Sequence, residues 1–167
     1  MPRVKEVVLT KRNSGESVVA EIAAPPDRVY DLISNVTRMG ERSPECIHCE
    51  WADGATGPAV GARFKASNKA ARGPAWFNKP EVTVADPGRE FAFNRKGPGI
   101  GSYTWRYRLE PIARGTRVTE SYEVERPVPK AMNWLTEKWT GSTDRDADLR
   151  TGMQTTLSRL KEAAEAG

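Results

Sequence analysis

Hydrophobic and polar positions alternate from Val18 to Ala23, which is typical of a half-buried β-strand. The prolines that follow suit the first turn of a helix, where a missing N–H costs little, and the pattern predicts a helix over Pro26–Asn35. A short second helical turn is expected near Val36–Gly40, ahead of Pro44, because proline cannot continue a helix. The first helix is expected to bury Val29, Tyr30, Leu32 and Ile33.

Beyond Pro44 the period of two returns, and glycine and proline interrupt the chain often. Turn sequences such as ADPGRE and ARGT separate the apolar runs. This order indicates a meander of strands and not an alternating series of strands and helices. The predicted strands are Cys46–Trp51, Ala62–Asn68, Phe77–Asp86, Glu90–Arg95, Ser102–Pro111 and Arg117–Glu125.

Near the C-terminus the period changes to that of a helix. A first segment is expected from Lys130 to about Trp139, and a break follows, with Ser142 or Thr143 as the N-cap of a long last helix. An antiparallel sheet of this length must cover one face, and the last helix is its natural cover. The sequence therefore predicts an α+β fold. The apolar stripe of the last helix is Leu149, Met153, Leu157, Leu160 and Ala164.

The length of 167 residues suits a single domain over residues 1–167, large enough to fold without a disulfide or a structural metal. The net charge is +4, but 26 basic residues are spread among 22 acidic ones, so no nucleic-acid partner is expected. No apolar run approaches the roughly 18 residues of a membrane-spanning helix. The N-terminal residues lack the apolar core of a signal peptide. We therefore expect no integral membrane association and a cytoplasmic location, and the oligomeric state stays open.

Strand alternation also indicates which side chains face the interior. Tyr103, Trp105, Tyr107 and Leu109 share one face of their strand, and this aromatic face should be the inner one. In the next strand Glu120 falls into an otherwise apolar row, where an ionised carboxylate is costly unless it is paired, hydrogen-bonded or protonated. The row of the next strand is Val118, Glu120, Tyr122 and Val124.

The hypothesis for Glu120 is that it is the polar handle of a pocket, with Arg95 or Asn68 nearby, and that it orients a ligand or acts as an acid/base group. The alternatives are a structural salt bridge, or a bulge that turns Glu120 to solvent. Glu120 and Arg95 are the catalytic candidates. The candidate ligand-binding residues are Asn68, Trp76, Phe93, Tyr103, Trp105, Tyr107, Glu120, Tyr122 and Met153.

The order of elements and the wording of several segments resemble the START-related helix-grip superfamily (SRPBCC), specifically its polyketide cyclase/dehydrase-like branch. These segments are VAEIAAPPDRVYDLISNV, SPE followed by CEW, GPAVGARFKASN, ADPGREFAF, YTWRYRLEP and GTRVTESYEV. The resemblance covers about Glu16 to Ala164 and leaves residues 1–13 as either an N-terminal extension or an added strand segment. It implies a helix-grip fold, in which a curved antiparallel sheet of about six to seven strands wraps around the long last helix. An elongated apolar cavity then lies between the sheet and this helix.

For function, the resemblance implies that the cavity binds a hydrophobic or amphipathic small molecule, such as a lipid or a polyketide. Members of the superfamily include both enzymes and carriers, so the fold predicts a pocket but not a reaction. The first hypothesis is therefore a ligand-binding protein. The alternatives are an enzyme of polyketide cyclase/dehydrase type that uses the same cavity, and a protein-interaction module.

The segment Cys46–Cys49 holds both cysteines of the chain and its one histidine, His48. In a regular strand residues three apart face opposite sides, so Cys46 and His48 should share one face and Ile47, Cys49 and Trp51 the inner one, and the two thiols are not expected to meet. Three ligands are also fewer than the four that structural zinc takes. We therefore expect no metal and no cofactor, with Cys49 buried beside Trp51 and His48 on the solvent side.

Overall fold

The computed structural model of the protein describes residues 15–167, the side chain of Thr136 excepted. The expected N-terminal extension, residues 1–13, lies outside the described residues.

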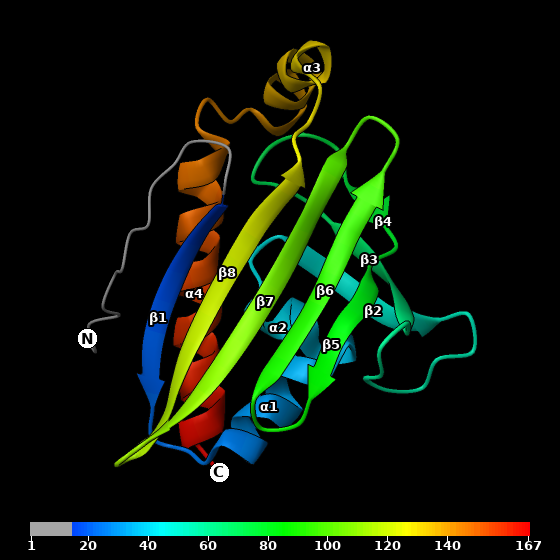
Figure 1. Cartoon of the computed structure of the whole chain (residues 1–167). Helices are drawn as coiled ribbons and strands as arrows, with labels where there is room; N and C mark the ends of the chain where they lie inside the picture. The colour runs from blue at the N-terminus through cyan, green and yellow to red at the C-terminus, as the bar shows by residue number, and fades with distance from the viewer. Residues whose placement is uncertain (1–14) are drawn as a thin grey trace.

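An antiparallel sheet of eight strands forms most of the fold, in the order β1-β8-β7-β6-β5-β3-β2, with β4 paired to β3 (Figure 1). Strands that follow one another in sequence are mostly neighbours in the sheet, as the meander predicted. The strands are β1 (Gly15–Ile22), β2 (Cys46–Ala52), β3 (Arg63–Asn68), β4 (Trp76–Asn78), β5 (Glu81–Asp86), β6 (Glu90–Gly97), β7 (Gly101–Ile112) and β8 (Gly115–Arg126).

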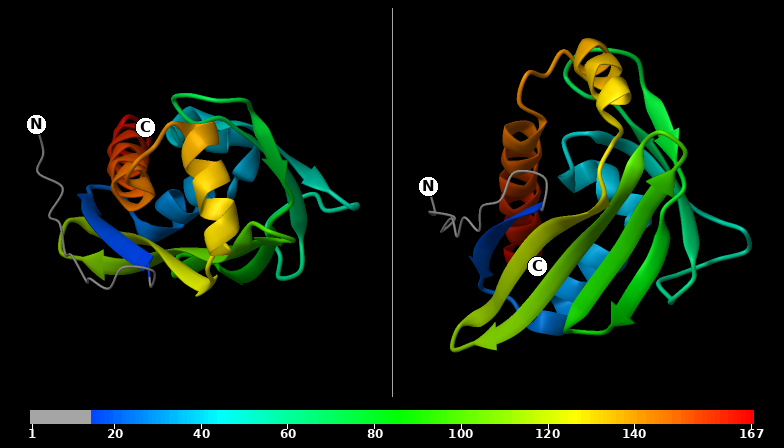
Figure 2. Two further views of the ribbon diagram at one scale, coloured as in Figure 1. Left: turned by 90° about the horizontal axis from the view of Figure 1, so that it is seen from above. Right: turned by 45° about the horizontal axis from the view of Figure 1, so that its top comes forward.

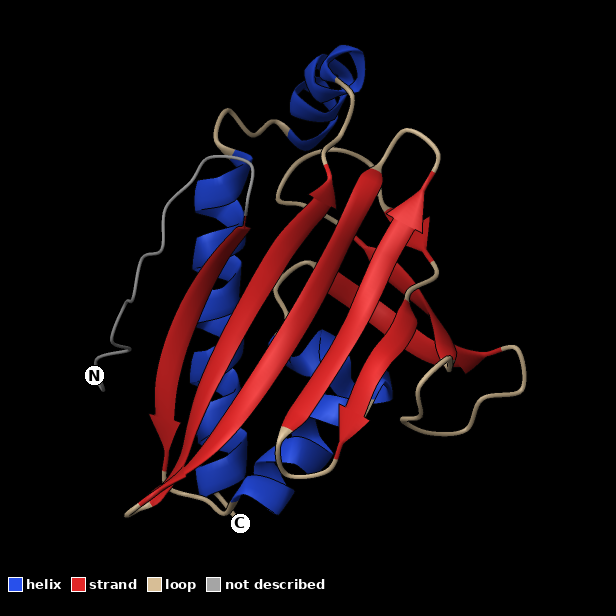
Figure 3. Cartoon of the chain, in the orientation of Figure 1, coloured by secondary structure: helices blue, strands red, loops and turns tan. Residues whose placement is uncertain are grey.

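Four of the described helical segments lie on the concave side of this sheet (Figure 3). These are α1 (Pro26–Ser34), the 3-10 turn η1 (Val36–Arg38), α2 (Met39–Arg42) and the long α4 (Arg145–Glu165). Seen from above, the sheet curves around them, and α3 (Lys130–Thr140) lies across one end (Figure 2). The α+β class and the helix-grip arrangement that the sequence predicts are confirmed.

The apolar stripe of α4 fills the concave face. Four residues at the predicted spacing are buried: Met153, Leu157, Leu160 and Ala164. Leu149, one turn before them, packs against the same core but is only half-buried. The C-terminal half of α4 therefore supplies most of its apolar contact with the sheet.

Two differences from the sequence prediction are a break within a strand and the position of a helix cap. The expected strand Phe77–Asp86 is split into β4 and β5, because Pro80 between them cannot donate a ladder hydrogen bond. The N-cap of α4 is Asp144, whose side chain accepts a hydrogen bond from the Ala147 amide at 3.1 Å, and not Ser142 or Thr143.

Helix α3 rests on loops at the open end of the sheet. A Cβ added to Gly73, in the β3–β4 loop, would lie 1.7 Å from the Trp139 carbonyl oxygen, so the backbones touch there. Gly99, in the β6–β7 turn, lies against Met132. The outer face of α3 leaves Trp134 and Trp139 64% and 54% exposed. Among the described helices, none is long and apolar enough to cross a membrane.

Replacement of Leu157 by alanine tests the packing of α4. Leu157 is fully buried, so the lost contacts and the cavity left behind should lower the free energy of unfolding by about 2–5 kcal/mol in urea titration. The neighbouring Ser158→Ala, on the exposed face of the same helix, should change it by less than about 0.5 kcal/mol. Equal effects of the two variants would contradict the assigned helix face.

Candidate functional site

The inner face of the sheet is closed at one end and partly exposed at the other. Along β7, Leu109 and Tyr107 are 5% and 8% exposed, whereas Trp105 and Tyr103, nearer to α3, are half-buried. The inward row of β8 follows the same trend and ends in the half-buried Val124. Burial on this face of β7 and β8 therefore decreases towards the α3 end. The predicted inward orientation of both rows agrees with this burial.

Glu120 is a buried carboxyl on this inner face. It pairs with Tyr107 in the β7–β8 register, and the Tyr107 hydroxyl donates a hydrogen bond to its Oε1 at 2.8 Å. Glu120 is 3% exposed, and its Oε2 has no hydrogen-bond partner among the described residues. Burial raises the pKa of Glu120 from 4.5 to about 8, although the bond from Tyr107 and the charge of Arg42 act in the opposite direction. Glu120 is therefore mainly protonated at neutral pH.

Arg42, at the end of α2, brings a buried positive charge to the same region. It is 6% exposed, and its Nη2 donates a hydrogen bond to the Asn35 carbonyl at 3.4 Å. Burial lowers the pKa of Arg42, while the neighbouring Tyr107 acts to raise it. A void of about 10 Å³ lies between these groups and α4, close to the smallest space that holds one water molecule. Its lining residues are Ile33, Met39, Arg42, Tyr107, Thr156 and Leu160.

A second cation, Arg95, lies at the α3 end of the inner face. Its guanidinium covers the ring of Tyr103, with 4.7 Å between Cζ and the ring centroid. Burial lowers the pKa of Arg95, and the ion pair between Arg145 and Glu45 lies close enough to influence it. Within the described part of the chain, Arg95 itself forms no ion pair. Its charge is therefore available to a ligand in a way that the charge of Arg145 is not.

Aromatic contacts connect this end of the sheet to the start of α4. The rings of Trp105 and Tyr122 lie 5.3 Å apart, and the Tyr122 hydroxyl donates to Asp146 Oδ1 at 3.0 Å. Burial and the nearby carboxylate raise the pKa of Tyr122, so its hydroxyl stays a donor. Tyr122 thus separates the half-exposed aromatic residues from the more deeply buried Glu120.

The other candidate residues divide between the rim and the core. Asn68 and Trp76 face each other in the β3–β4 register and are half-buried. Phe93 is 7% exposed and packs edge-on against Phe64, with ring centroids 5.3 Å apart, and Met153 is 1% exposed. Asn68 and Trp76 can therefore touch a ligand without rearrangement, whereas Phe93 and Met153 can do so only if the core opens.

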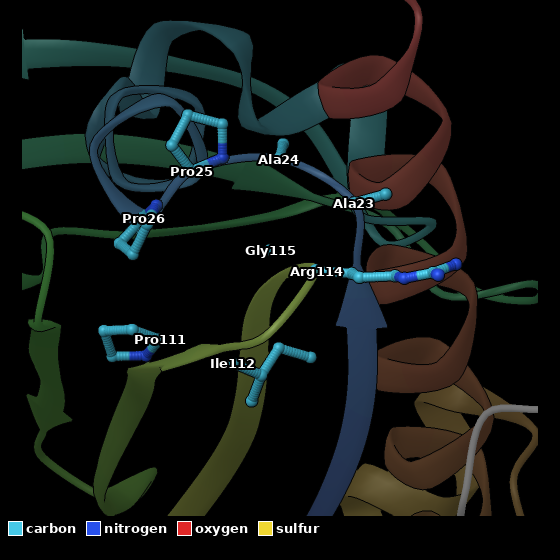
Figure 4. A pocket seen from close by; sticks show the side chains of 8 residues that line it. All are labelled: Ala23, Ala24, Pro25, Pro26, Pro111, Ile112, Arg114 and Gly115. Carbon is cyan, nitrogen blue, oxygen red and sulfur yellow. The ribbon is translucent and has the colours of Figure 1, made fainter.

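A separate groove of about 410 Å³ lies at the opposite end of the molecule (Figure 4). It is open to solvent and is bordered by the β1–α1 connection and the β7–β8 turn. Its lining is mostly proline and alanine, with Arg114 the one charged residue: Ala23, Ala24, Pro25, Pro26, Pro111, Ile112, Arg114 and Gly115. No cluster of convergent polar groups faces it, so we do not assign chemistry to it.

The sequence profile of the polyketide cyclase / dehydrase and lipid transport family matches residues 16–165, nearly the whole described chain. The chain belongs to this family. The resemblance stated from the sequence is thereby confirmed, and a ligand-binding or cyclase-type role follows at that level of detail. No curated protein shows significant sequence similarity to this chain.

Three solved structures illustrate how widely the fold is shared. The solution structure of the Polyketide_cyc-like protein Cgl2372 from Corynebacterium glutamicum is 32% identical, with a TM-score of 0.55, and covers 89% of this chain and 90% of its own. Protein CV1439 from Chromobacterium violaceum is 17% identical, with a TM-score of 0.67 and 91% and 98% coverage. The di-domain aromatase/cyclase (ARO/CYC) StfQ of the steffimycin biosynthetic pathway is 15% identical, with a TM-score of 0.72, and matches 93% of this chain over 52% of its own.

Two parts of the prediction for Glu120 are corrected by the geometry. Arg95 pairs with Tyr103, which lies four residues from Tyr107 along β7, or roughly 13 Å along a strand. Arg95 is therefore not the partner of Glu120, which has Tyr107 and Arg42 beside it. Asn68 instead donates a hydrogen bond to the Ala66 carbonyl of its own strand. The alternatives of a salt bridge or a turn to solvent do not apply either, since Glu120 points inward and its hydrogen bond comes from a phenol.

Arg42 is the residue that the sequence analysis missed. It lies in the segment RMGERSPE, whose charge density indicates a solvated loop, and no periodic pattern marks it as buried. Its burial comes from tertiary contacts of α2, including a hydrogen bond of 3.3 Å from Arg159 of α4 to the Arg42 carbonyl. The burial of Arg42 therefore becomes apparent only once α4 is seen to pack against α2.

The prediction for the two cysteines was wrong in its geometry. A register shift between Cys46 and His48 turns Cys46 inward, so that both Cys46 and Cys49 are buried and their sulfur atoms lie 3.2 Å apart. Cys49 is buried and His48 exposed, as expected, but Ile47 is 55% exposed instead of facing the core. Over the described residues no group of three or more His, Cys, Asp or Glu side chains is arranged to hold a metal.

The ionisation of Glu120 can be measured directly. The NMR signal of its side-chain carboxyl carbon should titrate with a midpoint at about pH 8 and not at pH 4.5. The unfolded chain releases this proton at lower pH than the folded chain. The free energy of unfolding should therefore fall as the pH rises from 4.5 to about 8. Glu120→Gln, which keeps the neutral form, should remove this part of the pH dependence in urea titrations. A midpoint near 4.5 would contradict the buried site.

Proposed function

We propose that the protein binds a hydrophobic or amphipathic small molecule, such as a lipid or a polyketide, between the sheet and α4. The molecule enters at the α3 end. The observation that carries this proposal is the gradient along the inner face, which is tightly packed around Leu109 and half-open around Tyr103 and Trp105. Half-buried aromatic side chains beside a poorly compensated cation offer both apolar contact and a polar anchor.

Arg95 is the anchor in this proposal. Its guanidinium stacks on the Tyr103 ring and forms no ion pair with the described residues. A carboxylate or carbonyl of the ligand can therefore bind to this guanidinium. The apolar part of the ligand then extends along Trp105 towards Met153. Membership of a family described by polyketide cyclase, dehydrase and lipid transport supports this class of ligand.

Enzymatic cyclisation is a second candidate, favoured by the state of Glu120. A carboxyl with a pKa of about 8 and an unpartnered Oε2 can donate a proton to a carbonyl oxygen at neutral pH and take it back afterwards. The Tyr107 hydroxyl would hold the Glu120 carboxyl in place through its hydrogen bond, and Arg42 would orient that carbonyl oxygen. The aromatase/cyclase StfQ shares the fold, which is compatible with this candidate but does not distinguish it from binding alone. A cytoplasmic location stays a prediction.

Binding of a matched pair of ligands tests the proposal and its anchor. A long-chain fatty acid and its methyl ester are titrated into the protein by calorimetry, with native mass spectrometry to count bound molecules. The wild type should bind one molecule of each. Arg95→Gln should weaken binding of the acid by about 10- to 100-fold, since a hydrogen bond to a charged group is lost, and leave the ester within about threefold.

Arg108→Gln, with a 61% exposed side chain on the outer face of the same sheet, is the matched control and should change neither affinity. Binding by the wild type with no effect of Arg95→Gln would overturn the anchor but not the site. Failure of the wild type to bind these ligands or aromatic polyketides would overturn the proposed function.

A further inference from the structure

The two cysteines form a buried pair that the proposed function does not use. Cys46 pairs with Asn68 and His48 with Ser67, so Cys46 and Ile47 together occupy one step of the ladder. Such a β-bulge turns one side chain to the other face of its strand. It places Cys46 and Cys49 on the inner side, with sulfur atoms 3.2 Å apart.

Neighbouring elements hold the bulge in this shape. A Cβ added to Gly40 of α2 would lie 2.7 Å from the Ile47 carbonyl oxygen, so α2 packs directly on the bulged peptide. The sulfur of Met39, from the same helix, lies 3.9 Å from Cys49 Sγ. Contacts with α2 thus preorganise the two thiols. The β2–β3 hydrogen-bond ladder on the other edge of this strand is interrupted by the bulge.

The two thiols have different environments. The hydrogen bond from Cys49, the His48 amide and the charge of Arg42 lower the pKa of Cys46, whereas the bond to Cys46 and burial raise the pKa of Cys49. Cys46 is 6% exposed and Cys49 is fully buried. Cys46 is therefore both the better nucleophile and the thiol that a small oxidant meets first.

We propose that Cys46 and Cys49 are a site of reversible oxidation and form an intramolecular disulfide with a peroxide as oxidant. The sulfur of Cys46 attacks a peroxide oxygen, the O–O bond breaks, and a sulfenic acid and one water are formed. Cys49 Sγ then attacks Cys46 Sγ, a second water leaves, and the S–S bond forms. In sum, the two thiols lose two protons and two electrons, and the peroxide takes up both and is reduced to two waters.

The distance supports this step. A disulfide has sulfur atoms about 2.05 Å apart, so the pair has to close from 3.2 Å by only about 1 Å. Oxidation also removes the ionisable Cys46 thiol from the surroundings of Arg42 and Tyr107, whose pKa values it influences. The state of the pair is thereby connected to the region around Glu120.

Mass spectrometry of the full chain after treatment with hydrogen peroxide tests the proposal. The chain has two cysteines, so the assignment is unambiguous. The wild type should lose the mass of two hydrogen atoms and both alkylatable thiols, and regain them with dithiothreitol. A digest should show one peptide in which Cys46 is joined to Cys49. Oxidised methionines gain oxygen and are separated by their peptides.

The variants separate the two steps. In Cys49→Ser the reaction should stop at a sulfenic acid of Cys46 that dimedone traps, and this adduct should be absent from the wild type. Three results would overturn the proposal. After peroxide treatment and unfolding, both wild-type thiols could still be alkylated, the disulfide could join two chains, or both cysteines could be oxidised separately to sulfinic acids. Because these readouts use the wild type, poor folding of a serine variant does not affect them.

Discussion

The packing of α4 into the concave face of the sheet is the interaction on which the rest of the structure depends. Its buried stripe runs from Met153 to Ala164, and Leu157 and Leu160 within it are fully buried. The first turns of α4 instead reach the sheet through polar contacts, such as the ion pair of Arg150 with Glu16 and the contact of Asp146 with Tyr122. The helix thus contacts the sheet through apolar side chains at one end and polar ones at the other, and the inner-face residues Tyr103, Trp105 and Val124 near α3 are only half-buried.

The same packing explains why a carboxyl can stay inside. An ionised Glu120 would be costly in this surrounding, and protonation removes most of that cost. The Tyr107 hydroxyl satisfies one oxygen, and the other is left without a partner in the described structure. A neutral, incompletely bonded acid in an apolar wall is unusual in a purely structural role, which is why it supports a chemical one.

Much of this arrangement could be predicted from the sequence because most strands are regular. The period of two was sufficient to place Tyr103 and Trp105 on the inner face and to single out Glu120 as the polar exception. It failed at Cys46, because a bulge adds one residue to the ladder without changing the hydrophobic pattern. Arg42 could not be found either, since its burial is produced by the docking of α2 against α4 and not by any local preference.

The location of the bound ligand tests the central claim most directly. In an NMR titration with a long-chain fatty acid, amide shifts should change for Arg95, Tyr103 and Trp105 at the α3 end, and extend towards Met153. The groove at the other end has amides at Ala23, Ile112 and Gly115 that should stay unchanged. Shifts confined to that groove, with none along the inner face of β7, would contradict binding between the sheet and α4.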